Sequence, residues 1–402
     1  MNLWIDTSTL ARAQALFGLP PLERLRRSAA KASEGATVVL SGPAASPAAW
    51  PGAKVDADTA PLGTRLRRAL AAGQGVVAIA AGHVVDPRLI GFLLKSAVPA
   101  LASRGQGPRR AVALRLDPSH ADAIPTDAAD LGAVADALVA AGRIAPVDEA
   151  AFPAYVNKLR RSLPYWLHVV EDGATRKRLE RQMFWENYKG STDLLTRWVY
   201  PPIVWPLVLL CTRLRIHPNV VTLVSIGFTV AAVPLFARGD WIAGFVCAYA
   251  MSVLDSVDGK VARLTLTDSR IGNVLDHGID QVHPPFWYFA WAWGLGARSA
   301  ADPLWQAAVW LIFFYFADRI VLFVAKRRLG FALHAATRLD GQVRSYIARR
   351  NITMTIMAFA LLIGQGPTGF WIVSVWQALT FGWHAARTIW LGFISRSARP
   401  EA

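Results

Sequence analysis

The chain has 402 residues, 53% of them hydrophobic, and it contains 16 tryptophans. This length allows two domains, and this apolar content excludes an ordinary soluble protein. The formal net charge is +15, but the basic residues lie mostly at the ends of apolar segments, where they set the orientation of membrane proteins. We therefore expect membrane lipid around the chain and no nucleic acid partner.

Residues 1–175 are predicted to form a cytoplasmic α/β domain with a Rossmann-like, mainly parallel sheet. Short apolar runs typical of strands alternate there with stretches that favour helices. The predicted strands are 37–40, 76–79 and 111–114, and the predicted helices are 62–72, 87–101 and 129–141. The first residues lack the basic and apolar regions of a signal peptide, so this domain is expected to stay in the cytoplasm.

The segment Ala81-Gly-His-Val-Val-Asp-Pro87 is similar to a strand end of the sugar-phosphate nucleotidyltransferases, with Gly82 where that family carries an acidic metal ligand. Such domains occur ahead of a membrane module in the bifunctional inositol-phosphate cytidylyltransferase/di-inositol-phosphate-phosphate synthases. The segment 70–75 superficially resembles their phosphate loop, but it follows a predicted helix and precedes a predicted strand. Gly73 is therefore interpreted as a helix C-cap, and we expect a degenerate, inactive nucleotidyltransferase-like domain.

Residues 176–218 are predicted to form a basic linker and an interfacial helix. Two interpretations of the basic stretch 155–188 stay open: a solvated linker helix, or an arm on anionic headgroups. The aromatic anchors of such an arm would be Tyr165, Trp166, Phe184 and Trp185. Residues 194–214 contain three prolines and end in basic residues, which suits a helix lying along the membrane surface, although their length also allows a span.

Four aspartates stand in an otherwise apolar region. Asp255 and Asp258 are spaced i, i+3, and Asp276 and Asp280 are spaced i, i+4, so each pair lies on one helix face. Two such faces turned toward each other gather four carboxylates, which repel unless protons or cations neutralise them. All-oxygen ligands favour Mg²⁺ or Mn²⁺, and no cysteine joins the cluster to favour zinc.

The aspartates belong to a longer pattern, D-x2-D-G-x2-A-R-x8-G-x3-D-x3-D. Its fixed positions are Asp255, Asp258, Gly259, Ala262, Arg263, Gly272, Asp276 and Asp280. This pattern resembles the signature of the CDP-alcohol phosphotransferase (CDP-alcohol phosphatidyltransferase) family. The resemblance implies an all-α, six-helix transmembrane domain at 219–395 that releases CMP from a CDP-alcohol, and a homodimer through the spans is common in that family.

The resemblance also implies roles for individual residues. It implies two Mg²⁺ or Mn²⁺ ions held by Asp255, Asp258, Asp276 and Asp280, with Asp280 as the general base for the acceptor hydroxyl. The residues expected along the nucleotide are Pro218, Asn219, Gly259, Ala262, Arg263 and Gly272, with Pro218 and Asn219 near the cytidine.

Six apolar segments are predicted to span the membrane. They are 220–237, 241–258, 272–296, 304–325, 352–364 and 370–393. Each is near the roughly 20 residues that a bilayer requires, and the fifth is short. Basic residues gather in the loops on the side of the N-terminal domain. We therefore expect a multi-pass protein of the cell inner (cytoplasmic) membrane, with the N-terminus and the active site in the cytoplasm.

Polar residues interrupt the later spans and the loop between them. Asp318 and Arg319 are interpreted either as a mutual ion pair or as part of an acceptor pocket. Arg344 and residues 349–351 either hold a phosphate on the acceptor or set the topology. His384 and Arg387 are interpreted either as snorkelling or capping side chains or as part of the acceptor pocket.

These observations predict a transferase that moves a substituted phosphate group from a CDP-alcohol to an acceptor hydroxyl, in phospholipid or phosphodiester biosynthesis. CDP-diacylglycerol and a polar donor such as CDP-inositol stay open as donors. The alternative function is a non-catalytic membrane scaffold or metal-binding protein that retains the fold.

Overall fold

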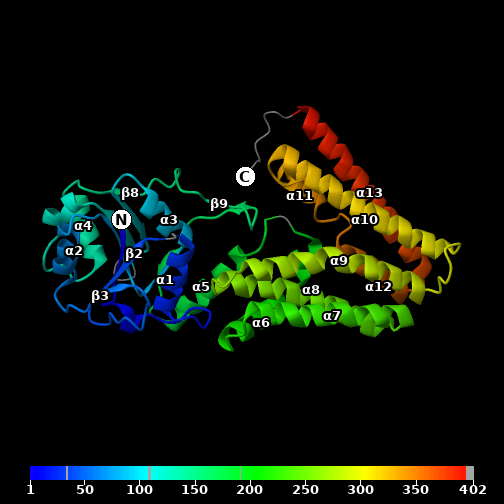
Figure 1. The fold of residues 1–402 in the computed structure, drawn as a ribbon, viewed down its shortest axis with the longest axis horizontal. Helices are drawn as coiled ribbons and strands as arrows, with labels where there is room; N and C mark the ends of the chain where they lie inside the picture. The colour runs from blue at the N-terminus through cyan, green and yellow to red at the C-terminus, as the bar shows by residue number, and fades with distance from the viewer. Residues whose placement is uncertain (33–34, 107–109, 191, 395–402) are drawn as a thin grey trace. The chain divides into compact units, whose positions relative to one another are not determined.

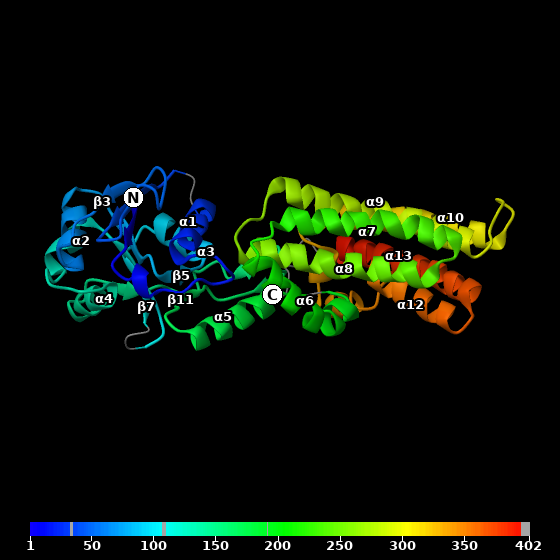
Figure 2. The ribbon, with the colours of Figure 1, turned by 90° about the horizontal axis from the view of Figure 1, so that it is seen from below.

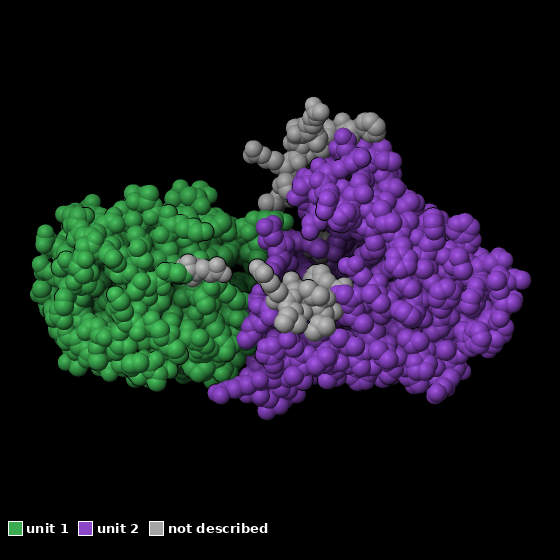
Figure 3. Space-filling model, viewed as in Figure 1, with its two compact units in different colours: residues 1–156, 162–186, 264–266 green, residues 157–161, 187–263, 267–402 purple. Residues whose placement is uncertain are grey.

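The computed structural model describes residues 1–32, 35–106, 110–190 and 192–394. Within its helices, the side chains of residues 270, 271, 273–277, 393 and 394 lie outside this description. The chain divides into two compact units, which Figure 3 colours separately. Unit 1 comprises residues 1–156, 162–186 and 264–266, and unit 2 comprises residues 157–161, 187–263 and 267–402.

Unit 1 is built on a seven-stranded sheet with the order β3-β2-β1-β4-β7-β6-β8. The strands of this sheet are β1 Asn2–Asp6, β2 Thr37–Ser41, β3 Lys54–Asp56, β4 Val76–Ala80, β6 Ala100–Arg104, β7 Ala111–Leu116 and β8 Ala145–Pro146. Two short pairs lie outside it: β5 His83–Val85 with β11 Leu167–Val169, and β9 Tyr155–Val156 with β10 Arg161–Ser162. β7 runs antiparallel to its neighbours β4 and β6, and the other pairings of this sheet are parallel. The sheet is therefore mainly parallel, as predicted, with one reversed strand.

Four helices cover the two faces of this sheet (Figure 1). They are α1 Pro21–Ala32, α2 Leu62–Ala71, α3 Pro87–Lys95 and α4 Leu131–Ala140. α1 and α3 pack with Leu3 and Ile5 of β1, and α2 and α4 pack with Trp4. Successive side chains of a strand point to opposite faces, so a strand covered on both sides is apolar throughout.

Most of the predicted elements of unit 1 are confirmed. The strands at 37–40, 76–79 and 111–114 lie in β2, β4 and β7, and the helices at 62–72 and 129–141 correspond to α2 and α4. The helix predicted at 87–101 is wrong in its second half, because α3 ends at Lys95 and β6 begins at Ala100. Pro99 gives the physical reason, since proline disfavours helical backbone at the residue before it.

The order of elements around residues 70–75 is as predicted. α2 ends at Ala71, β4 begins at Val76, and Gly73 lies between them with φ +83°. The Gly73 N–H donates to the Leu70 carbonyl at 3.0 Å. A left-handed glycine after a helix closes that helix, so this segment is a helix end and not a strand-to-helix phosphate loop.

Helix α5, Gly173–Glu186, carries part of the basic stretch and packs within unit 1. Its Glu180 Oε1 accepts a hydrogen bond from the Phe17 N–H at 2.9 Å. Tyr165 and Phe184 are buried, which removes two of the four aromatic side chains predicted as membrane anchors. Trp185 is 47% exposed.

Unit 2 is helical in the part that the structure describes. A short π-helical segment, Leu195–Val199, precedes α6. The α-helices are α6 Pro201–Arg213, α7 Pro218–Arg238, α8 Trp241–Leu264, α9 Arg270–Gly294, α10 Pro303–Leu329, α11 Arg338–Val343, α12 Arg350–Leu362 and α13 Gly366–Ile394. Judged on the described residues, α7, α8 and α10 are long and apolar enough to cross a membrane. Each of the six predicted apolar segments coincides with a helix, and α12 is the short one with 13 residues.

Aromatic packing holds α7, α8 and α9 side by side (Figure 2). Phe236 of α7 lies 5.0 Å from Phe245 of α8, and 5.8 and 5.7 Å from Trp287 and Trp291 of α9, between ring centroids. A Cβ on Gly294 would lie 2.1 Å from the Phe236 carbonyl oxygen, so glycine permits this close approach. The packing fixes the register of the helices that carry the sequence motif.

A buried pair joins α10 to α13. Asp318 Oδ1 lies 2.5 Å from His384 Nδ1, and both side chains are buried. The interpretation of His384 as a snorkelling or capping residue is therefore wrong, because its ring is 1% exposed. In the described contacts Asp318 pairs with His384 rather than with Arg319, whose guanidinium lies 4.9 Å from the ring centroid of Tyr315.

Candidate functional site

α7 and α8 meet at a buried hydrogen bond. Asp258 on α8 is 4% exposed, and its Oδ2 accepts a hydrogen bond from the Thr222 hydroxyl on α7 at 2.6 Å. Thr222 stands one turn into α7, which begins at Pro218, a residue suited to the first helical position. The carboxylate therefore has a hydrogen-bond partner, as a buried polar group requires.

Arg350 binds two of the motif aspartates. Its Nη2 lies 2.8 Å from Asp255 Oδ2, and its Nη1 pairs with Asp280 Oδ1. Asp255 is on α8, Asp280 is on α9, and Arg350 is the first residue of α12. A single guanidinium thus joins three helices through charge-assisted hydrogen bonds.

Asp276 lies one helical turn before Asp280 on α9, so the two residues start from the same face of that helix. Its side chain is outside the described part of the chain. Among the residues that the structure describes, no three His, Cys, Asp or Glu side chains form a group ready to hold a metal ion. The four-carboxylate metal site therefore stays a prediction.

The donor atoms fit a hard divalent cation. Asp255, Asp258 and Asp280 offer only carboxylate oxygens, which Mg²⁺ and Mn²⁺ prefer. The guanidinium of Arg350 lies between the carboxylates of Asp255 and Asp280, so this space between α8 and α9 already holds a positive charge. The residues present are compatible with the predicted metal.

The start of α9 approaches the start of α7 closely. Ser269 caps α9, and its Oγ accepts a hydrogen bond from the Gly272 N–H at 3.0 Å. A Cβ on Gly272 would lie 2.8 Å from Asn219 Oδ1 on α7. Any side chain at Gly272 would therefore push Asn219 away.

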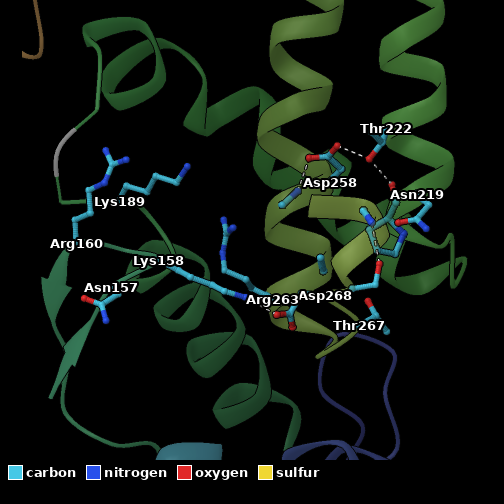
Figure 4. Close-up of a pocket in the computed structure, with 15 residues that line it drawn as sticks. Asn157, Lys158, Arg160, Lys189, Asn219, Thr222, Asp258, Arg263, Thr267 and Asp268 are labelled. Atoms are coloured by element: carbon cyan, nitrogen blue, oxygen red, sulfur yellow. Dashed lines mark hydrogen bonds and ion pairs between the residues drawn. The ribbon is translucent and has the colours of Figure 1, made fainter. Parts of the chain in front are cut away.

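A cavity of about 230 Å³ lies within unit 2 beside these residues (Figure 4). It is lined by seven of the ten predicted site residues: Pro218, Asn219, Asp258, Gly259, Ala262, Arg263 and Gly272. Asp255 and Asp280 are held by Arg350 and are not part of this lining. The residues expected along the nucleotide thus line one cavity together with Asp258, one of the four motif aspartates.

A polar network supports Arg350 from the segment before α6. Asn351 Nδ2 donates to Asp193 Oδ1 at 3.0 Å, and Asn351 Oδ1 accepts a hydrogen bond from the Ser252 hydroxyl at 2.5 Å. Burial by itself raises the pKa of Asp193, but Arg349 and the hydrogen bonds outweigh it, so the pKa lies below its usual value. An ionised Asp193 holds Asn351, the residue next to Arg350.

Sequence reasoning does not assign five further lining residues to the site: Asn157, Lys158, Arg160, Lys189 and Thr222. It interprets Arg350 only as an acceptor or topology residue. The available signal for Arg350 is its place beside Asn351 at the start of an apolar helix, where polar residues carry function. Thr222 gives no comparable signal, because a threonine in an apolar helix commonly bonds its own backbone.

The apolar helices and the polar cavity of unit 2 define a membrane protein with acidic residues among its helices. Residues 215–390 match the family model described as CDP-alcohol phosphatidyltransferase. This match covers less than half of the chain, and this part of the chain is similar to that family.

Similar proteins carry related names. The chain is 29% identical over 118 residues to an uncharacterized CDP-alcohol phosphatidyltransferase class-I family protein of Schizosaccharomyces pombe, and the match covers 25% of this chain and 30% of that protein. It is 26% identical over 212 residues to phosphatidylinositol phosphate synthase of Mycobacteroides abscessus, covering 49% and 89% of the two chains. A crystal structure of Mycobacterium tuberculosis phosphatidylinositol phosphate synthase with CDP-DAG bound matches with a TM-score of 0.39 and 18% identity, covering 50% of this chain and 98% of that one.

Proposed function

We propose that this chain is an integral-membrane transferase that moves a substituted phosphate group from a CDP-alcohol to an acceptor hydroxyl and releases CMP. The observation that carries the proposal is that one cavity is lined by seven of the predicted site residues, all within residues 215–390. Asp258 lies in its wall, so a nucleotide in this space would have a carboxylate beside it. CDP-diacylglycerol and a polar CDP-alcohol such as CDP-inositol are both compatible donors.

The predicted cofactor is Mg²⁺ or Mn²⁺, as two ions. Asp255, Asp258, Asp276 and Asp280 are the residues that would hold them. Bound there, the ions would offset the charge of the donor diphosphate and of the departing CMP.

The chain's own residues would position and deprotonate the acceptor. We assign Asp280 as the general base that takes the proton of the acceptor hydroxyl, and Arg350 as the residue that fixes the position of this carboxylate. The hydroxyl oxygen then forms a bond to the phosphorus distal to cytidine. The bond between that phosphorus and the bridging oxygen breaks, and CMP leaves with the electron pair. Gly259 and Gly272 would let the nucleotide approach the helix backbones.

We propose that α7, α8, α9, α10, α12 and α13 are the six spans of the family domain. Each coincides with a predicted apolar segment, and the basic residues of the connecting loops favour one side. This arrangement would place both ends of the domain and the start of α7 on the cytoplasmic side of the inner membrane. Accessibility labelling of single cysteines in the loops tests it, because alternate loops should react from opposite sides.

CMP release by the purified full-length chain tests the proposed reaction. We expect release with Mg²⁺ and at least one CDP-alcohol and acceptor pair, and a loss of roughly 100-fold or more in Asp280→Asn. Asp240→Asn is the matched control, since it removes an exposed carboxylate between α7 and α8 and should keep activity. Absence of release with every pair from folded protein would support the scaffold alternative instead.

We also propose that unit 1 has no nucleotidyltransferase activity. Gly82 follows β4, at the position where the sugar-phosphate nucleotidyltransferases carry an acidic metal ligand. Gly73 closes a helix and does not form a phosphate loop. Pyrophosphate release from CTP with a sugar or polyol phosphate measures this directly. Release above the level of a heat-denatured sample would contradict the proposal.

A further inference from the structure

One wall of the cavity in unit 2 is made by basic residues from outside the family domain. Lys158, Arg160 and Lys189 all precede residue 215, where the match to the family begins. Figure 4 shows Arg160 and Lys189 on the side of the cavity opposite Asp258 and Thr222, whereas Lys158 reaches toward Asp268. The part of the chain that precedes the family domain therefore contributes directly to this space.

The basic residues make different contacts. Lys158 Nζ lies 2.8 Å from Asp268 Oδ2. Arg263 Nε donates to Asn187 Oδ1 at 3.1 Å. Arg160 and Lys189 line the same space as Arg263. Three cations thus share one side of the cavity.

The pKa of Lys189 reflects the repulsion between this side chain and the neighbouring cations. Its side chain is accessible within the cavity, but the walls limit its hydration. This poor hydration, together with the positive charges of Arg263 and Arg160, lowers the pKa of Lys189 to about 8. Asp255 opposes this shift and Arg349 adds to it. An anion bound among the three cations would remove the repulsion.

We propose that Arg160 and Lys189 form a phosphate-binding wall that holds the diphosphate of the CDP-alcohol opposite Asp258. This inference rests on the proposed function. The ligand is assigned to the donor because these cations line the same cavity as Asn219 and Gly272, which are expected along the nucleotide. Ammonium and guanidinium groups are the usual protein ligands of phosphate oxygens.

Arg160 and Lys189 can bind a diphosphate without a metal ion, whereas the carboxylates cannot. Carboxylates repel a diphosphate unless a metal lies between them, whereas Arg160 and Lys189 attract it directly. Binding of CDP in the presence of EDTA should therefore depend on the wall. Cytidine lacks phosphate and should bind independently of it.

Isothermal titration of the full-length chain in detergent with EDTA tests the proposal. CDP affinity should fall about tenfold or more in Arg160→Ala and in Lys189→Ala, as for loss of one charge-assisted hydrogen bond. Cytidine affinity should stay constant. Lys177→Ala, which removes an exposed cation of α5 outside the cavity, is the matched control, and Lys189→Arg should retain most of the CDP affinity.

Three results would overturn the wall. Equal losses for CDP and cytidine would show that the residues only support the fold. Unchanged CDP affinity in both alanine variants would show that no phosphate lies there. Inorganic phosphate that binds CDP-saturated wild type but not CDP-saturated Lys189→Ala would assign the wall to an acceptor phosphate. A wild-type chain that binds neither CDP nor cytidine, with Mg²⁺ as well as with EDTA, would instead refute the proposed function itself.

Discussion

Replacing Arg350 by glutamine tests whether this side chain is the internal counter-charge of the acidic site. Its guanidinium binds Asp255 on α8 and Asp280 on α9, and its own side chain is 16% exposed. Glutamine keeps similar length and polarity but removes the charge. Two carboxylates would then face the same space without this guanidinium, and the three helices would lose their common partner.

The magnitude follows from the two ion pairs. Opposite charges about 4 Å apart attract by about 4 kcal/mol at an effective dielectric constant of about 20. The Asp255 and Asp280 side chains are 22% and 42% exposed, so water screens both pairs and reduces each contribution by about half or more. We therefore expect Arg350→Gln to lower the free energy of unfolding of the metal-free protein by about 2–4 kcal/mol.

Thermal and denaturant unfolding in detergent, with EDTA and with Mg²⁺, measures this effect. The loss should be large in EDTA and much smaller at saturating Mg²⁺, because a bound cation would replace the missing guanidinium. Arg350→Lys, which keeps a charge but not the two-pronged geometry, should fall between wild type and glutamine. Equal stability of Arg350→Gln and wild type in EDTA would refute the reasoning.

Three further predictions concern single contacts. Thr222→Val should reduce CMP release about tenfold by leaving Asp258 without its hydroxyl partner, whereas Thr222→Ser should not; equal activities would contradict this. Gly272→Ala should lower kcat/KM about tenfold in a folded protein, since the new methyl group displaces Asn219. Burial lowers the pKa of His83 to about 4, so the folded state binds fewer protons than the unfolded state between about pH 4 and 6.5. The free energy of unfolding should therefore rise over this window by up to about 3 kcal/mol, and His83→Gln should flatten the rise.

Local sequence patterns predicted the strands and helices that are marked by an apolar run or by a capping residue. The strands β2, β4 and β7 are apolar runs in the sequence, and α4 begins after Asp130, whose side chain accepts from the Ala133 N–H at 2.9 Å. The end of α3 was beyond such patterns, because the connection between α3 and β6 has only four residues and includes two apolar residues before Pro99. Composition does not distinguish a buried strand from a buried helix.

The site was predictable where its residues share one helix. Asp255 and Asp258 are close together in α8, so their spacing alone predicts a shared face. Arg350 stands 95 residues after Asp255 and reaches it only because α12 packs beside α8. Thr222 likewise meets Asp258 across a helix pair. Tertiary packing decides these contacts, and no periodicity in the sequence encodes them.

The charges of unit 2 suggest how a diphosphate would be balanced from two sides. Asp255 and Asp280 share the single positive charge of Arg350, whereas Lys189 is repelled by Arg160 and Arg263 in the cavity. The charges of this site balance when an anion binds beside the basic residues and a further cation binds beside the carboxylates. A donor diphosphate with its metal ions supplies both. Residues 157–161 would then belong to the catalytic domain in function, although they precede the family motif by about a hundred residues in sequence.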